Sequence, residues 1–207
     1  MIGLLTAWFH PLLVALFGKS IPFTYRWRLL LLQPLISTLF SLKVLPWTFS
    51  HAYTVHYIPT RSGSVRCIIF KPESRNKWPK PLRPLHLDIH GGAFFGGAAE
   101  FDAEFAQQVA VRTGAVVVCA TYRVAPVYSY PAAHDDIEDV IYWLHKNAED
   151  KLGADPELMT ISGFSAGGNL ALAASQLPEC QEPNRTAIKA ALLFYAAVSF
   201  YLSRCSS

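Results

Sequence analysis

Charged residues are scarce in this 207-residue sequence. Only 16% of its residues are Asp, Glu, Lys or Arg, whereas 52% are hydrophobic, and a typical globular protein carries about 25% charged residues. Because so much apolar material can offset the entropy lost on folding, a disordered and strongly solvated chain is excluded. The net charge of +3 is small and Lys and Arg form no dense run, so we expect no nucleic-acid partner.

Cysteine is also rare. The four cysteines are Cys67, Cys119, Cys180 and Cys205, and their spacing matches neither a metal site nor a disulfide framework. Cys67 and Cys119 lie in apolar, strand-like runs, so we expect both to be buried thiols. We expect no metal and no other cofactor.

Acidic residues are absent from the first 72 positions, which carry seven basic residues. The apolar runs 2–17 and 29–46 are interrupted by proline or polar residues, and the first is shorter than the roughly 20 residues that span a bilayer. Nothing near the start has the pattern of a secretory signal. We therefore expect residues 1–50 to form helices that cover an apolar pocket or make peripheral contact with a membrane, and not a span.

The rest of the chain alternates between strand-like and helix-like segments. We expect strands at 52–58, 65–70, 85–89, 115–120, 158–162 and 188–198, and helices at 100–113, 132–147 and 166–176. The unbroken apolar run 115–120 is typical of a strand buried on both faces of a parallel sheet. Repeated β-α units of this length predict an α/β fold, with a mostly parallel sheet and helices on both faces.

A glycine-rich turn lies between the last short strand and the helix that follows it. Its residues are Gly163-Phe164-Ser165-Ala166-Gly167-Gly168-Asn169, and G-x-S-x-G between a strand and a helix is the pattern of a nucleophile elbow. The turn is so tight that side chains at positions 163 and 167 would collide with neighbouring elements. Ser165 would then stand clear of the sheet, near the positive end of the following helix.

A second glycine-rich turn follows the strand at 85–89. It reads His90-Gly91-Gly92-Ala93, and consecutive glycines allow backbone N–H groups to converge on a small anion such as the oxyanion of a tetrahedral intermediate. The two turns should lie side by side at the carboxyl ends of their strands, where such sheets bind ligands.

With these two motifs in order, the chain resembles the hormone-sensitive-lipase-like carboxylesterases of the α/β-hydrolase fold. The stretch Tyr122-Arg123-Val124-Ala125-Pro126, with Pro131 to Asp136, adds a third ordered motif, and the resemblance covers about residues 52–198. It implies that Ser165 is the nucleophile. The oxyanion-hole candidates are Gly91, Gly92, Ala93 and Ala166, and the supporting residues are His90, Gly163 and Gly167.

The chain departs from the family pattern at two positions of these motifs. Ala93 stands where a third glycine is frequent, and Phe164 stands where an Asp is frequent beside the nucleophile. The resemblance further implies that residues 1–50 form a helical cap above the carboxyl edge of the sheet. The aromatic residues of this cap would suit an acyl-binding roof, although plain packing of two helices accounts for them equally well.

No histidine follows Ser165, and Glu179 and Glu182 are the only later acids. In this fold the order along the chain is Ser, then Asp or Glu, then His, so the resemblance predicts a chain that lacks the catalytic Asp and His and the last strands of the sheet. His90 is expected to hold backbone geometry and His134 to be structural. Residues 199–207 are expected to be a tail outside the family pattern, so the domain predicted at 51–198 would be a truncated hydrolase domain.

Two functions remain open from the sequence. The first is a serine carboxylesterase or lipase-like hydrolase that forms an acyl-enzyme at Ser165 on a small apolar ester, with little or no turnover in this chain. The second is a non-enzymatic small-molecule binder of hydrolase descent. A third function, less favoured than these two, is that of a membrane-surface protein whose role depends mainly on residues 1–50.

Overall fold

The computed structural model describes residues 16, 26, 35, 38, 39, 41–72, 82–125, 127–177 and 188–198. The chain divides into two compact units, Met1–Ser50 and His51–Ser207. In the first unit residues 41–48 are helical, and most of the predicted cap at 1–50 lies outside the described residues. Within the described part of the chain, no helix is both long and apolar enough to cross a membrane. The predicted tail at 199–207 also lies outside the described residues.

The described part of the second unit contains one six-stranded sheet, ordered β1-β2-β4-β3-β5-β6. The strands are β1 (Thr54–Thr60), β2 (Gly63–Phe70), β3 (Arg83–Ile89), β4 (Val116–Ala120), β5 (Ala154–Phe164) and β6 (Ala190–Phe194). β1 and β2 form a hairpin, and β2 pairs antiparallel with β4. β4, β3, β5 and β6 are mutually parallel, so their carboxyl ends lie at one edge of the sheet.

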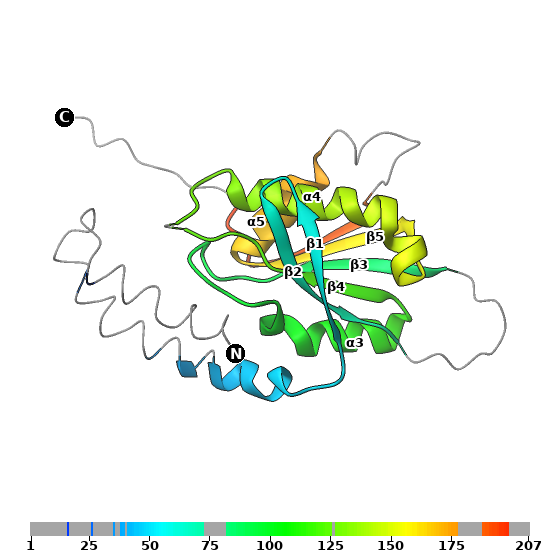
Figure 1. Cartoon of the computed structure of the whole chain (residues 1–207), viewed down its shortest axis with the longest axis horizontal. Helices are drawn as coiled ribbons and strands as arrows, with labels where there is room; N and C mark the ends of the chain where they lie inside the picture. The colour runs from blue at the N-terminus through cyan, green and yellow to red at the C-terminus, as the bar shows by residue number, and fades with distance from the viewer. Residues whose placement is uncertain are drawn as a thin grey trace. The chain divides into compact units, whose positions relative to one another are not determined.

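Helices cover both faces of this sheet (Figure 1). The helix α3 (Ala103–Thr113) follows the short 3-10 helix η1 (Ala99–Asp102) on one face, whereas α4 (Ala132–Asn147) and α5 (Ala166–Ser175) lie on the other. A π-helical turn, η2 (Ala148–Leu152), joins α4 to β5. The predicted fold class, α/β with a mostly parallel sheet and helices on both faces, is therefore confirmed.

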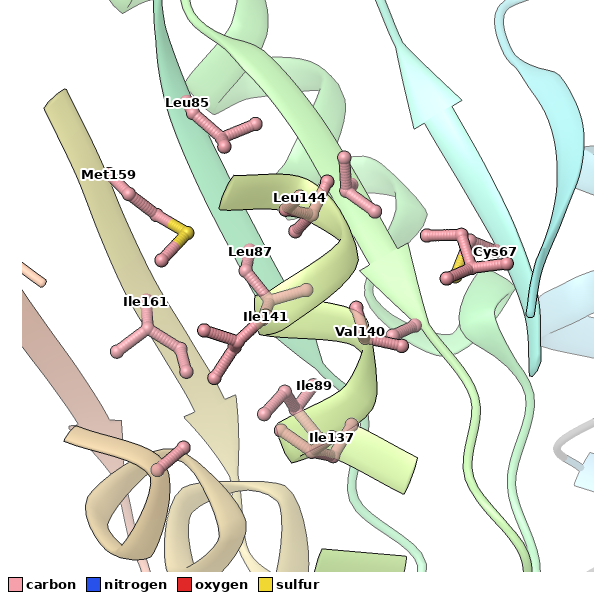
Figure 2. Packing of buried hydrophobic residues seen from close by; sticks show 14 of the residues in the cluster. Cys67, Leu85, Leu87, Ile89, Ile137, Val140, Ile141, Leu144, Met159 and Ile161 are labelled. Carbon is pink, nitrogen blue, oxygen red and sulfur yellow. The ribbon is translucent and has the colours of Figure 1, made fainter. Parts of the chain in front are cut away.

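The hydrophobic core lies between the sheet and the α4 face. Because side chains alternate along a strand, one set of β3 residues faces α4. Figure 2 shows the packing of Ile137, Val140, Ile141 and Leu144 of α4 with Leu85, Leu87 and Ile89 of β3 and with Met159 and Ile161 of β5. The run 115–120 is buried as predicted, with every residue of β4 inaccessible to solvent.

β5 is longer than predicted, because it begins at Ala154 and not at Leu158. Its first residues include exposed and polar positions, which hide the strand from a pattern search, yet Ala154 and Asp155 pair with Arg83 and Pro84 of β3. A register shift between Pro84 and Leu85 then restores the regular ladder. The tertiary pairing with β3 therefore overrides the local sequence pattern.

Candidate functional site

Ser165 lies in a sharp turn between β5, which ends at Phe164, and α5, which begins at Ala166. Its backbone angles are φ +52° and ψ −114°, a region that few non-glycine residues adopt. A Cβ at Gly163 would lie 2.2 Å from Gly167 O, and a Cβ at Gly167 would lie 2.0 Å from Ile89 O. Both positions therefore require glycine, Gly163 because the elbow folds back on its own backbone and Gly167 because the elbow lies against the end of β3.

The end of β6 and the segment that follows it contact this elbow at three points. The Ser165 N–H donates to Phe194 O at 2.9 Å, and the Asn169 side-chain amide donates to Ala197 O at 2.7 Å. A Cβ at Gly168 would lie only 2.6 Å from the Cβ of Ala196. The strained turn at Ser165 is thus held by β6 and by the residues that directly follow it.

The glycine turn after β3 lies directly against the elbow. A Cβ at Gly91 would lie 2.9 Å from Phe164 O and 3.5 Å from the Cβ of Ser165. Gly92, Ala93 and Phe94 all have positive φ, at +140°, +52° and +63°. The structure therefore brings the two predicted turns together at the carboxyl edge of the sheet, and Ala93 adopts a left-handed conformation in place of a third glycine.

His90 and Tyr122 pack against each other and bond to the backbone of the turn. The buried His90 ring stacks on Tyr122 with centroids 4.6 Å apart, and the Tyr122 hydroxyl donates to His90 O at 3.1 Å. His90 Nδ1 lies 2.6 Å from Gly91 O, a carbonyl that can only accept, so this nitrogen carries the proton. Burial lowers the pKa of His90 to about 4, so the ring is neutral near pH 7.

The loop after β4 is hydrogen-bonded both to the residue after the glycine turn and to α4. Ala125 N–H donates to Phe94 O at 2.7 Å, and Arg123 pairs with the buried Asp136 of α4, with Nη2 and Oδ1 2.9 Å apart. The Arg123 backbone N–H also donates to Asp136 Oδ2 at 2.8 Å. The third motif of the sequence thus fixes the loop beside the glycine turn to α4.

Aromatic side chains pack beneath the elbow on the α3 face. The Phe164 ring stacks on Phe194 with centroids 4.5 Å apart, and Phe105 of α3 meets Phe164 edge-on at 5.4 Å. An apolar cluster therefore occupies the place where the family pattern often has an Asp.

None of the predicted residues brings an imidazole to Ser165. In the described part of the chain the Ser165 hydroxyl has no hydrogen-bond partner. His134 packs instead on Phe94 and Tyr130, with ring centroids 6.3 Å and 5.2 Å away. The described residues also contain no group of three or more His, Cys, Asp or Glu side chains placed to hold a metal.

A different Ser, His and Asp are bonded to one another inside the sheet. His86 Nε2 lies 2.9 Å from Ser162 Oγ, and Ser162 Oγ lies 2.5 Å from Asp88 Oδ1. This triad-like arrangement does not support the prediction that the chain has lost its catalytic Asp and His. However, Ser162 and Asp88 are fully buried and His86 is 4% exposed, so none of the three can meet a substrate in this conformation.

Sequence reasoning missed this network, although a signal for it exists. Polar residues alternate at 86 and 88 in β3 and at 160 and 162 in β5. In the parallel register His86 pairs with Thr160 and Asp88 with Ser162. Burial raises the pKa of Asp88 well above its usual range, and the negative charge of Asp102 raises it further. Burial lowers the pKa of His86 to about 4.

The two cysteines in the described part of the chain lie on β2 and β4. Cys67 and Cys119 are both free and buried, as predicted. Burial raises the pKa of the Cys67 thiol to about 12, so it is protonated and unreactive near pH 7.

Comparisons with known proteins agree with this geometry. The model of a family described as α/β hydrolase fold matches residues 86–206, which include most of residues 199–207. Arylacetamide deacetylase from Oryctolagus cuniculus is 35% identical over 144 residues, which cover 68% of this chain and 35% of that protein. Carboxylesterase NlhH from Mycobacterium tuberculosis is 37% identical over 103 residues, covering 48% of this chain and 32% of that protein.

Solved structures give the same picture. A hyperthermophilic esterase from Pyrobaculum calidifontis matches with a TM-score of 0.64 at 31% identity, over 76% of this chain and 49% of that one. The thermostable carboxylesterase EstE1, cloned from a metagenomic library, matches with a TM-score of 0.70 at 27% identity, over 83% of this chain and 57% of that one. The chain thus spans about a third of these curated relatives and about half of these structures.

Proposed function

Since the chain belongs to the α/β hydrolase fold family, of the hormone-sensitive-lipase-like type, we propose that it is a serine hydrolase of carboxylic esters with Ser165 as its nucleophile. The observation that carries the proposal is the contact between the two turns, because a Cβ at Gly91 would lie 3.5 Å from the Cβ of Ser165. A nucleophile and a set of backbone donors so close together suit attack on a carbonyl carbon.

The proposed reaction begins when Ser165 Oγ forms a bond to the ester carbonyl carbon. The carbonyl oxygen becomes an oxyanion, which Ala166 N–H and two N–H groups from Gly91, Gly92 and Ala93 would stabilise. Ala166 is also the first residue of α5, whose dipole is positive at this end. The alcohol then leaves with a proton and the acyl group stays on Ser165, until water attacks the acyl carbon and releases the acid.

The step that limits the rate is removal of the Ser165 proton. A serine hydroxyl near pH 7 is a weak nucleophile unless a base takes its proton, and none of the described histidines is bonded to Ser165. Losing the base typically costs on the order of 10⁴ to 10⁶ in turnover. We therefore propose that this 207-residue chain hydrolyses esters slowly.

The substrate we propose is a small ester with apolar groups. Phe95, just after the glycine turn, and Tyr195, after β6, are large side chains exposed to solvent at 63% and 77%. Both follow the carboxyl ends of their strands. The names carboxylesterase and esterase among the similar proteins support an ester as the substrate, and we propose that its acyl chain is short or medium.

Hydrolysis of p-nitrophenyl butyrate by the purified chain tests the proposal, with Ser165→Ala as the variant and Ser175→Ala as the control. We expect turnover well below about 1 s⁻¹, abolished by Ser165→Ala and kept by Ser175→Ala. Equal rates in Ser165→Ala and the unaltered chain would contradict the role of Ser165. Turnover above that value would contradict slow chemistry, and His134 would then be the first histidine to replace.

A ligand-binding function is the second candidate, because the Ser165 hydroxyl has no base bonded to it in the described residues. In this case a butyrate ester would bind with the same affinity to the chain and to Ser165→Ala, and neither would release product. Equilibrium binding measured beside the turnover assay separates the two candidates.

A further inference from the structure

Four polar side chains form one hydrogen-bonded row on the α3 face of the sheet. His86 Nδ1 lies 2.7 Å from Thr160 Oγ1, His86 Nε2 lies 2.9 Å from Ser162 Oγ, and Ser162 Oγ lies 2.5 Å from Asp88 Oδ1. The row crosses back and forth between the parallel strands β3 and β5. It is separate from the elbow at Ser165, and the proposed hydrolysis does not use it.

The number of hydrogens fixes the direction of this row. Ser162 has one hydroxyl hydrogen and two partners, so one partner must donate to Ser162 Oγ while the other accepts. If Asp88 is ionised it can only accept, and His86 must then donate from Nε2 and accept from Thr160 at Nδ1. If Asp88 carries a proton it donates to Ser162, Ser162 donates to Nε2, and the neutral His86 donates from Nδ1 to Thr160.

Only in the second arrangement can the Thr160 hydroxyl hydrogen bond to an acceptor other than His86. Thr160 Oγ1 lies 3.5 Å from Leu85 O, with the geometry of a donor. When His86 donates to Thr160, the Thr160 hydroxyl is available for this carbonyl, and all hydrogen bonds of the row then run in one direction, from Asp88 to Leu85 O. Asp88 Oδ2 is buried and has no hydrogen-bond partner among the described residues, and an unpaired buried oxygen costs less free energy on a neutral acid than on a carboxylate.

The surroundings of Asp88 also favour a neutral acid. From η1, Asp102 acts on it with a negative charge, and Glu100, which also lies on this face, is paired with Arg66. From β4 the neighbour is Cys119. Along the chain the neighbours are His86 of β3 and His90, just after β3, and both are neutral near pH 7. In the described residues no cation contributes to the ionisation of Asp88, so an isolated buried charge would cost a great deal of free energy.

We propose that Asp88 keeps its proton in the folded protein at neutral pH and donates it to Ser162, which fixes His86 as the Nδ1–H tautomer. Asp88, Ser162, His86 and Thr160 are then a buried one-proton relay, in which removal of the Asp88 proton reverses each hydrogen bond along the row. Folding of the chain consequently takes up a proton at neutral pH. The stability of the sheet that carries the proposed site therefore depends on pH.

The tautomer of His86 is the direct test. In the ¹⁵N-labelled full chain near pH 7, long-range ¹H–¹⁵N correlation spectra should show His86 protonated at Nδ1 and bare at Nε2. Asp88→Asn should leave that pattern unchanged, because its amide can also donate to Ser162. A proton on Nε2 alone would mean that Asp88 is ionised, and protons on both nitrogens would mean an imidazolium with a carboxylate. Either result overturns the proposal.

Denaturation at a series of pH values gives an independent readout. The unfolded carboxyl titrates near pH 3.9, so between that value and the higher folded pKa the folded state binds more protons than the unfolded state. Stability from Asp88 therefore falls as the pH rises. The folding equilibrium constant of Asp88→Asn, relative to the unaltered chain, should increase up to about tenfold per pH unit above pH 4. The exposed Asp150→Asn is the control, and a flat or falling ratio for Asp88→Asn would contradict the proposal.

Discussion

At the scale of single residues, the site depends on backbone positions where a side chain has no room. Ser165 has φ +52° although it is not glycine, a conformation that costs on the order of 1–3 kcal/mol. The contacts with Phe194, Ala197 and the end of β3 supply the stabilisation that keeps it. The glycines of both motifs could be predicted from the sequence because each motif is a short recognisable pattern, although the contacts that require Gly91 and Gly167 come from distant segments.

Gly167→Ala should destabilise the protein strongly. The new methyl group would lie 2.0 Å from Ile89 O, and the backbone of β3 cannot move away without breaking its ladder with β4 and β5. We expect a loss of at least about 2 kcal/mol in the free energy of unfolding, in the range of overpacked cores, measured by urea denaturation. Gly96→Ala is the matched control, since a Cβ there meets nothing within 4 Å; equal losses in both variants would contradict the account.

His90 should make the protein sensitive to acid. Burial lowers its folded pKa to about 4, whereas an unfolded histidine titrates near 6.5. Between these values the unfolded state binds more protons, so stability falls as the pH drops, by up to about 1.4 kcal/mol per pH unit. His90→Gln should therefore show a flatter loss of stability than the unaltered chain between pH 6.5 and 4.5, with the exposed His51→Gln as the control. An unchanged slope in His90→Gln would contradict the neutral, buried state of His90.

At the scale of elements, the site is built where the ends of parallel strands meet. The apolar run at 115–120 and the period of the helix at 132–147 predicted β4 and α4 well, because one face or both faces of each are buried. The start of β5 and the row from Asp88 to Thr160 could not be predicted in this way. Both depend on the pairing of β3 with β5, which joins segments more than 70 residues apart.

Asp136→Asn should weaken the connection between α4 and the loop after β4. Asp136 is 1% exposed and accepts from both the side chain and the backbone of Arg123, and hydrogen bonds to charged groups are worth about 1.5–3 kcal/mol each. We expect a loss of about 2–3 kcal/mol in the free energy of unfolding, measured by thermal or urea denaturation.

Asp139→Asn provides the comparison on the same helix. Its partner Arg61 is exposed, and ion pairs of this kind contribute about 0–1 kcal/mol. A loss in Asp139→Asn as large as that in Asp136→Asn would show that burial does not decide the strength of these pairs.

At the scale of the whole molecule, the sheet has an apolar strand at one side. Among the described residues β6 pairs only with β5, and Leu192 and Leu193 are 43% and 37% exposed. An unpaired strand edge with apolar side chains can recruit another chain. The resemblance to the hydrolase family predicted the sheet and its glycine turns. No local sequence pattern, however, shows which strands pair with β6.

Leu193→Lys should reduce self-association of the chain. A charged side chain on an edge strand opposes edge-to-edge pairing, so the concentration at which larger species form in sedimentation velocity should rise at least several-fold. Val111→Lys, on the exposed side of α3, adds the same charge elsewhere and should have little effect. Equal improvement in both variants would mean that net charge, and not the edge of β6, controls association.

The most direct test of the central claim is mass spectrometry of the chain after incubation with p-nitrophenyl butyrate. The claim is that Ser165, held at the elbow beside Gly91, is the residue that takes the acyl group. The account predicts slow butyrylation of the peptide that contains Ser165 and no butyrylation of that peptide in Ser165→Ala, with Ser162 unmodified in both. Butyrylation of Ser162, or release of p-nitrophenol by the Ser165→Ala chain at the unaltered rate, would contradict it.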